Sequence, residues 1–540
     1  ITVKEYLRSI PNKGLGFGAF AASETTDFGF GDLPRVGFNY LGQFDGADEA
    51  DWQVVVEESG QATSEANQDR NLLTVNGWVF DGVLQFNVSS GLTTEATATF
   101  ASLFKASLSN VIAQCQNKIG TVGSWFTPSD FPFVSVGSDL LDQLQQQALS
   151  KGNRITHIYP ATSLQQGFIY HAITEPNDDA YRVQLLQDYH TALDTPVYLQ
   201  AWEACIETYP VLRTAFDWTV GVVQVVYEKG ALDVTFHDIS GLTSQEEKDS
   251  RILEIQLEDR NRSFDLREPS LFRLHIIKQG EEHFTILKNE HHSIADGWSG
   301  PVLLGQLHQF YDALSDQRPL RITPETTYLK AQEYFYHHLP AARDYWATHL
   351  KEVESANEID ALLDVKLPVD QQRTVEQSAS VELAVTGSEY ERLKTFTKSA
   401  GITVNTVVQF VWHKLLQVYS GSRQTIVGTT VSGRDLSVPG IENSVGLYIN
   451  TLPLLVDWDN GDSIAGQLLQ IQERLTAMNS HSFAHLARMQ KEGERMFHSL
   501  LVFENYPVSI EVATDSLESG LSLRDGQGYE QTNYPLTLVV

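Results

Sequence analysis

Strand and helix patterns alternate through most of this chain, and that alternation limits the folds it can adopt. The apolar run at residues 283–289 has the length and composition of a buried strand. Apolar residues recur with the period of a helix at residues 331–338, 341–350, 403–419 and 463–479. Because these patterns fill two parts of similar length, residues 155–330 and 331–540, we predict a bilobed α/β unit.

Residues 1–120 carry a mixed α/β pattern of their own. The glycine-rich segment 14–18 follows a helical pattern rather than a strand, so we interpret it as a tight turn and not as a phosphate-binding loop. Strands are predicted at 36–44, 51–57, 72–75 and 83–88, and an amphipathic helix at 94–117. The weaker pattern of residues 121–154 is interpreted as a linker that carries one short helix.

The net charge and the number of cysteines argue against several classes of protein. The chain has 38 Lys and Arg against 69 Asp and Glu, a net charge of −31. Nucleic-acid binding needs basic residues that neutralise phosphates, so we expect no nucleic-acid partner. Two distant cysteines, Cys115 and Cys205, predict neither a disulfide framework nor a cysteine-based zinc site. With no apolar run of 18 residues and no signal-peptide pattern, we expect a cytoplasmic protein without membrane contact.

The sequence patterns at both ends are typical of a fragment. The chain starts without Met inside a helical pattern, and it finishes on the apolar strand pattern 534–540. We therefore expect a fragment of a longer polypeptide, with a C-terminal lobe that is incomplete at its end.

The most informative segment is HHSIADG, residues 291–297. It follows an apolar strand, where neighbouring side chains point to opposite faces, so one histidine can face a cavity while the other stays inside the fold. Asp296 can turn back to fix the loop, and Gly297 permits a sharp turn. The alternatives are a buried, hydrogen-bonded histidine pair and a metal site. Adjacent strand histidines diverge and no third ligand lies nearby, so no metal is expected.

Several segments together resemble the condensation domain of nonribosomal peptide synthetases. HHSIADG is similar to that family's HHxxxDG signature, and PATSLQQG at 160–167 resembles its first motif in the form found with D-configured donors. LRTAF at 212–216 matches the end of the second motif, although Thr208-Tyr209-Pro210 replaces the usual Arg-His-Glu start. VGLYINT at 445–451 and FENYP at 503–507 resemble two later motifs, in the expected order.

This resemblance implies a V-shaped pair of chloramphenicol acetyltransferase-like α/β lobes with a tunnel between them. A donor and an acceptor carrier domain would bring thioesters on 4'-phosphopantetheine arms, and the chain itself would bind no cofactor. The acceptor amine would attack the donor thioester to form a peptide bond. The adenylation domain of the downstream module would be a further partner, usually in the same polypeptide.

The resemblance also assigns roles to individual residues. His292 would be catalytic, as a general base or by positioning the amine, and the backbone N–H of Gly297 would donate to the oxyanion. Structural support is assigned to His291, Asp296 and Arg434, and a tunnel-lining role to Trp298, Ser299 and Asn450. The simpler alternatives are a surface cation for Arg434, a turn residue for Asn450 and plain core for Trp298.

The N-terminal part resembles a related domain. Residues 3–18 and 38–43 are similar to late motifs of the epimerization domain of the same synthetases. That family's own HHxxxD segment and catalytic Glu belong upstream of what is present. We therefore expect residues 1–120 to be an inactive C-terminal remnant, followed by a condensation domain of the D-donor, L-acceptor type.

Four other functions share the fold. A non-catalytic platform that recruits carrier domains or a partner enzyme would typically have lost His292. Heterocyclising relatives carry DxxxxD in place of HHxxxDG, and ester formation would use the same fold. An epimerase is disfavoured by Gly297, because epimerization domains usually have another residue after the Asp.

Overall fold

The computed structural model describes residues 2–21, 33–44, 64, 71–122, 125–176, 178–353, 356–359, 379–458, 463–484, 496–504, 523–529 and 534–540. The chain divides into two compact units, Ile1–Asp130 and Phe131–Val540, so the division falls inside the stretch that we interpreted as a linker. The strand predicted at 51–57 lies outside the described residues.

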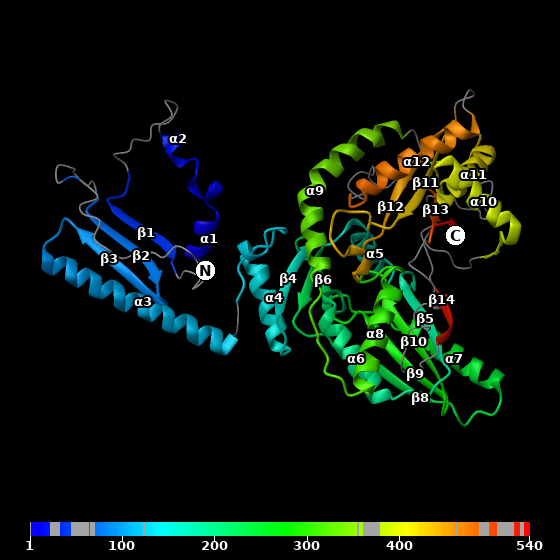
Figure 1. The fold of residues 1–540 in the computed structure, drawn as a ribbon, viewed down its shortest axis with the longest axis horizontal. Coiled ribbons are helices and arrows are strands. Elements are labelled where there is room, and N and C mark those ends of the chain that lie inside the picture. The colour runs from blue at the N-terminus through cyan, green and yellow to red at the C-terminus, as the bar shows by residue number, and fades with distance from the viewer. Residues whose placement is uncertain are drawn as a thin grey trace. The chain divides into compact units, whose positions relative to one another are not determined.

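The first unit contains a three-stranded sheet (Figure 1). Its elements are α1 (Thr2–Arg8), the 3-10 helix η1 (Pro11–Gly14), α2 (Phe17–Ala21), β1 (Val36–Gln43), β2 (Leu73–Phe80), β3 (Val83–Ser90), α3 (Thr94–Val122) and η3 (Pro128–Asp130). β2 pairs parallel with β1 and antiparallel with β3, and Phe104 of α3 packs 5.0 Å from Phe86 of β3. The predicted glycine turn is shorter than expected, because α2 begins at Phe17 and runs through Gly18.

The second unit begins with an α/β lobe. Its elements are α4 (Ser138–Ser150), β4 (Ile155–Pro160), α5 (Ser163–Thr174), β5 (Arg182–Tyr189), α6 (Thr195–Thr208), η4 (Pro210–Arg213), β6 (Thr214–Asp217), β7 (Val223–Tyr227), β8 (Asp233–Asp238), α7 (Gln245–Arg260), β9 (Phe272–Gly280), β10 (His283–His291) and α8 (Ser299–Ser315). The main sheet has the order β14-β5-β10-β9-β8, and a small sheet has the order β4-β7-β6. The predicted strand 283–289 is therefore confirmed as β10, near the centre of the main sheet.

The second lobe is built around another sheet, of order β12-β11-β13-β15. Its elements are α9 (Thr327–His349), η5 (Leu350–Glu352), α10 (Gly387–Ala400), α11 (Val404–Ser420), β11 (Gln424–Val431), η8 (Ile441–Asn443), β12 (Asn450–Asp457), α12 (Ile464–Ser480), β13 (Ser499–Val502), β14 (Leu523–Tyr529) and β15 (Leu536–Val539). β14 leaves this lobe and pairs antiparallel with β5 of the first lobe, as the red strand beside β5 in Figure 1 shows.

Helix α9 connects the two lobes. The helical patterns at 331–338 and 341–350 are confirmed, and they form one helix because α9 continues through Pro340. Tyr328 near its start packs in the core of the first lobe, whereas Trp346 near its end packs in the core of the second. Burial at both ends outweighs the hydrogen bond that the proline cannot donate.

The core of the first lobe also includes side chains from the second. Val438, Ile441, Val445 and Tyr448 belong to the same buried cluster as Leu303 of α8. The loop after β10 and the segment between β11 and β12 therefore meet across a packed interface. Within the described ranges, none of the helices combines the length and the apolar character needed to cross a membrane.

Candidate active site

Strand β10 brings the two histidines to the loop that leads into α8. His291 is the last residue of the strand, and its Nδ1 lies 2.8 Å from Oγ of Ser293. Burial lowers the pKa of His291 to about 3, because the charged imidazolium would lose its water, and the neighbouring His292 acts in the same direction. His291 is therefore a neutral imidazole at pH 7 that supports the loop.

The imidazole of His292 has a fixed tautomer. Its Nδ1 lies 2.7 Å from the carbonyl oxygen of Ala295, and a carbonyl can only accept a hydrogen bond. Nδ1 therefore carries the proton, and in the neutral ring the lone pair is on Nε2. The backbone N–H of His292 donates to the carbonyl of Tyr181 at 2.9 Å, and the ring of Phe168 stacks on the imidazole at 5.2 Å. His292 is only 7% exposed. Its burial and these contacts fix the orientation of the ring and therefore of Nε2.

Asp296 is bonded through both carboxylate oxygens. Oδ1 accepts the Ser299 backbone N–H at 3.0 Å, the Ser299 hydroxyl at 2.7 Å and Nη2 of Arg434 at 2.9 Å. Oδ2 accepts the backbone N–H of Tyr448 at 2.9 Å, and the residue is 3% exposed. A carboxylate that accepts this many hydrogen bonds holds the loop in place.

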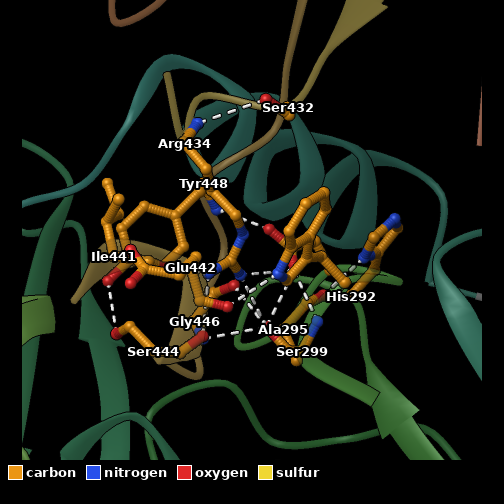
Figure 2. A network of polar contacts seen from close by, with 12 residues as sticks. His292, Ala295, Ser299, Ser432, Arg434, Ile441, Glu442, Ser444, Gly446 and Tyr448 are labelled. Carbon is orange, nitrogen blue, oxygen red and sulfur yellow. Dashed lines mark hydrogen bonds and ion pairs between the residues drawn. The ribbon is translucent and has the colours of Figure 1, made fainter. Parts of the chain in front are cut away.

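Arg434 completes the network from the second lobe (Figure 2). Its Nη1 donates to the carbonyls of Ile441 at 2.7 Å and Ser444 at 2.8 Å, and its Nη2 donates to Asp296. The guanidinium lies 4.2 Å from the ring centre of Tyr448, in the geometry of a cation–π contact. The predicted ion pair between Arg434 and Asp296 is thus present, and Arg434 is buried rather than a surface cation.

Gly297, Trp298 and Ser299 follow at the start of α8. Gly297 is exposed, and the half-buried Trp298 donates from Nε1 to the carbonyl of Glu442 at 2.9 Å. Ser299 is 1% exposed, and its hydroxyl lies 2.8 Å from the carbonyl and 3.0 Å from the backbone nitrogen of Gly446. The structure therefore places Ser299 inside the buried network, where Figure 2 shows it beside Gly446, and not on a tunnel wall as we predicted.

A pocket lies where the two lobes meet. It is lined mainly by apolar and aromatic side chains, from residues 160–163, from one face of α9, and from residues 448–450 and 482–483. Asn450, one of the predicted tunnel residues, lines it, and its Nδ2 donates to the carbonyls of Ser482 at 2.7 Å and Ala484 at 3.0 Å. Tyr448 lines the same pocket and bonds to Asp296 through its backbone, so the pocket adjoins the network that holds the histidine loop.

Sequence reasoning missed a second polar network behind the loop. Nε2 of Gln165 lies 2.9 Å from the carbonyl oxygen of Ser293 and 3.1 Å from Oε1 of Gln224. The hydroxyl of Tyr328 donates to the same Oε1, which ties the loop to α9. Gln165 belongs to the PATSLQQG motif, and that motif was the one available signal; Gln224 and Tyr328 carry none.

No group of three or more His, Cys, Asp and Glu side chains in the described part of the chain is arranged to hold a metal ion. Asp296 and Arg434 hold in place the loop that carries His292.

Comparison with known families matches residues 155–540 to the condensation domain. N-(5-amino-5-carboxypentanoyl)-L-cysteinyl-D-valine synthase of Amycolatopsis lactamdurans is 37% identical over 392 residues, which cover 70% of this chain and 11% of that protein. One of the subunits of mycosubtilin synthase from Bacillus subtilis is 30% identical over 556 residues, which cover 100% of this chain and 21% of that protein. The chain thus spans between about a tenth and a fifth of the length of these curated relatives.

Solved structures of the same fold are also similar to this chain. A four-domain nonribosomal peptide synthetase bound to AMP and glycine has a TM-score of 0.57 at 21% identity, covering 72% of this chain and 30% of that one. The first condensation domain of the calcium-dependent antibiotic synthetase, in complex with a substrate analogue, has a TM-score of 0.54 at 17% identity and covers 71% of this chain and 87% of that one. These likenesses confirm the predicted class of chloramphenicol acetyltransferase-like α/β lobes. The chain therefore belongs to the condensation-domain family of nonribosomal peptide synthetases.

Proposed function

We propose that residues 155–540 join two carrier-bound substrates by a peptide bond. The donor is a peptidyl or aminoacyl thioester on an upstream carrier, and the nucleophile is the free amine of an aminoacyl thioester on a downstream carrier. The new C–N bond replaces the donor C–S bond, so the thiol of the donor arm leaves and the amine loses one proton. The family assignment supports an amide-bond-forming acyltransferase in general.

The observation that carries this proposal is the contact between Nδ1 of His292 and the carbonyl of Ala295. It leaves the lone pair on Nε2, which can accept the proton of the attacking amine or hold that amine in place. General-base assistance of this kind is worth about 10²–10⁴ in rate, and positioning can contribute as much. The backbone N–H of Gly297 is the proposed donor to the oxyanion, at an exposed turn five residues after His292.

Partners follow from the same proposal. The relatives are proteins much longer than this chain, which supports donor and acceptor carrier domains and a downstream adenylation domain as partners. The substrates would arrive on 4'-phosphopantetheine arms, with no cofactor held by this chain itself. We expect the reaction to take place in the cytoplasm.

A D-configured donor is a finer part of the proposal. PATSLQQG has the form associated with D-configured donors, and the epimerization-like motifs at 3–18 and 38–43 precede it. We therefore propose a D-donor, L-acceptor domain, preceded by an epimerization remnant in residues 1–120 that is itself inactive.

Intact-mass analysis of the acceptor carrier tests this function. The donor carrier is loaded with a D- or an L-aminoacyl group, the acceptor carrier with an L-aminoacyl group, and the full chain is added. A dipeptide mass that appears with the D donor and at least about tenfold more slowly with the L donor is the expected result. Equal rates would refute the stereochemical part. No dipeptide with either donor, from a folded protein that still binds both carriers, would favour the recruiting platform instead.

A further inference from the structure

His292 contacts α5 through its imidazole and the loop before β5 through its backbone. Phe168 of α5 stacks on the imidazole with an interplanar angle of 20°, and the Phe168 ring lies 4.2 Å from the ring of Tyr181. The carbonyl of Tyr181 accepts the backbone N–H of His292 at 2.9 Å. Tyr181 therefore acts on His292 through its backbone and, by way of Phe168, through its ring.

Tyr181 has an unusual backbone conformation. Its φ is 67°, in the left-handed region that residues with a β-carbon adopt rarely. Such a conformation persists where the surrounding structure fixes it, and it recurs at functional sites. The contacts that hold Tyr181 in this conformation therefore decide where its carbonyl points.

A hydrogen bond between the side chains of His171 and Asp178 supplies such contacts. Nε2 of His171, on α5, lies 3.2 Å from Oδ2 of Asp178, and both side chains are largely buried. Oδ1 of Asp178 accepts the backbone N–H of Ala180 at 3.0 Å, and its carbonyl accepts Nη2 of Arg182 at 2.9 Å. The ring of His171 meets the ring of Tyr181 edge-on, 5.4 Å away. The pair thus joins α5 to the segment that carries the left-handed residue.

We infer that His171 and Asp178 are positioning residues for His292. The pair fixes residues 178–181, and Tyr181 with Phe168 then sets the direction of the His292 imidazole. Neither residue touches the reacting atoms. The inference rests on the proposed role of His292 in forming the peptide bond, and it also makes a claim about the imidazole that can be measured without catalysis.

Chemical modification tests that claim directly in the full chain. Diethyl pyrocarbonate acylates neutral imidazoles, and peptide mass spectrometry gives the rate at each histidine. In His171→Ala the loss of the pair loosens the stack, so the rate at His292 should rise roughly threefold or more. In His171→Gln, whose amide nitrogen can still donate to Asp178, the rate should stay near that of the wild type. His283, at the opposite end of β10, is the internal reference and should not change in either variant.

A second variant keeps the test decisive if His171→Ala does not fold. Asp178→Ala removes the partner of His171 and the acceptor of the Ala180 N–H, so it should also raise the modification rate at His292. An unchanged rate at His292 in folded His171→Ala or folded Asp178→Ala would overturn the inference.

The same variants are then assayed for condensation. His171→Ala should lower kcat by about 10-fold or more at unchanged KM for the acceptor carrier, because misplacement of a reacting group affects the chemical step. His171→Gln should recover most of kcat. A change in KM alone would contradict a positioning role. A wild-type chain that forms no dipeptide, with the modification pattern as expected, would refute the proposed function and leave the positioning of His292 standing.

Discussion

Asp296 and Arg434 retain almost no conformational freedom beside His292. Both oxygens of the aspartate and both terminal nitrogens of the arginine are bonded to groups drawn from the two lobes. The desolvation of such a buried pair largely offsets its attraction, so its main effect is to fix geometry. Loss of one partner is a different case, because it leaves a buried charge without compensation.

Replacing Arg434 with alanine should therefore be costly. We expect the free energy of unfolding to fall by about 3–5 kcal/mol, because the buried Asp296 would lose its ion-pair partner. Urea unfolding at pH 7 measures this. Arg251→Ala, which removes an exposed pair with Glu254, is the matched control and should change the midpoint little. A loss as small as that of the control would contradict the account of the network.

Gly433 precedes Arg434 and permits the turn that carries it. Its φ is 64°, and a β-carbon there would come within 1.9 Å of the carbonyl oxygen of Tyr448. Gly433→Ala should cost about 3–5 kcal/mol, from left-handed strain and overpacking together. Gly401→Ala has a φ of 67° with open space around it, so it should show the strain alone, about 1–2 kcal/mol. Equal losses in urea unfolding would mean that the close approach to Tyr448 is unimportant.

At the scale of elements, β10 depends on a buried cluster that it shares with α7 and β9. Asp259 of α7 accepts hydrogen bonds from Arg273 at 2.7 Å, from Gln184 and from Asn289 of β10, and it lies 3.2 Å from Nε2 of His275. Burial alone would raise the pKa of Asp259, but the bonds from His275 and Asn289 and the charge of Arg273 outweigh it and hold that pKa well below its usual range.

Asp259→Asn should weaken this support. The charge of Arg273 would remain buried without its partner, so we expect about 3–5 kcal/mol less unfolding free energy at pH 7. Because the folded-state pKa is depressed, the contribution of Asp259 is complete above the unfolded value near 3.9 and is lost as the pH falls below it. Urea unfolding of both proteins at pH 7 measures the difference, and a loss below about 1 kcal/mol would contradict a structural role.

Local patterns predicted the elements that depend on periodicity. The strand 283–289 and the helices 403–419 and 463–479 agree with β10, α11 and α12 to within one or two residues. The pairing of β14 with β5 could not be predicted, because no local pattern specifies a partner more than 300 residues away. The continuity of α9 through Pro340 was not predicted, because it depends on buried residues on both sides of the proline.

Some residues of the candidate site could likewise be predicted from adjacent sequence, whereas others depend on contacts that are distant in sequence. HHSIADG was recognisable because its residues are adjacent in sequence, and Arg434 was paired with Asp296 only by resemblance. Ser299 was misplaced because its burial depends on Gly446, which lies on the other lobe. Tyr181 gave no signal, because its left-handed backbone is imposed by contacts and is not marked by a glycine.

At the scale of the whole molecule, buried neutral histidines make the free energy of unfolding depend on pH. Burial lowers the pKa of His291 and of His413 to about 3 and that of His308 to about 4. The unfolded chain protonates these side chains near pH 6.5, whereas the folded chain does not. The unfolded state thus binds more protons between about pH 6.5 and pH 4, and stability must fall as the pH falls through that window.

Urea midpoints at pH 7, 6 and 5 should show this decline. Each such histidine can contribute up to about 1.4 kcal/mol per pH unit once the pH is below 6.5. His308→Gln should make the decline shallower. A midpoint that stays constant from pH 7 to pH 5 would contradict the assignment of neutral, buried imidazoles.

The most direct test of the account is the single-turnover rate of dipeptide formation with and without the His292 imidazole. Wild type, His292→Ala and His283→Ala are compared at saturating loaded carriers, after circular dichroism has shown that all three are folded. We expect His292→Ala to slow dipeptide formation by about 10²–10⁴, whereas His283→Ala should keep the wild-type rate. A wild-type rate in His292→Ala would contradict the central claim that this histidine carries the condensation chemistry.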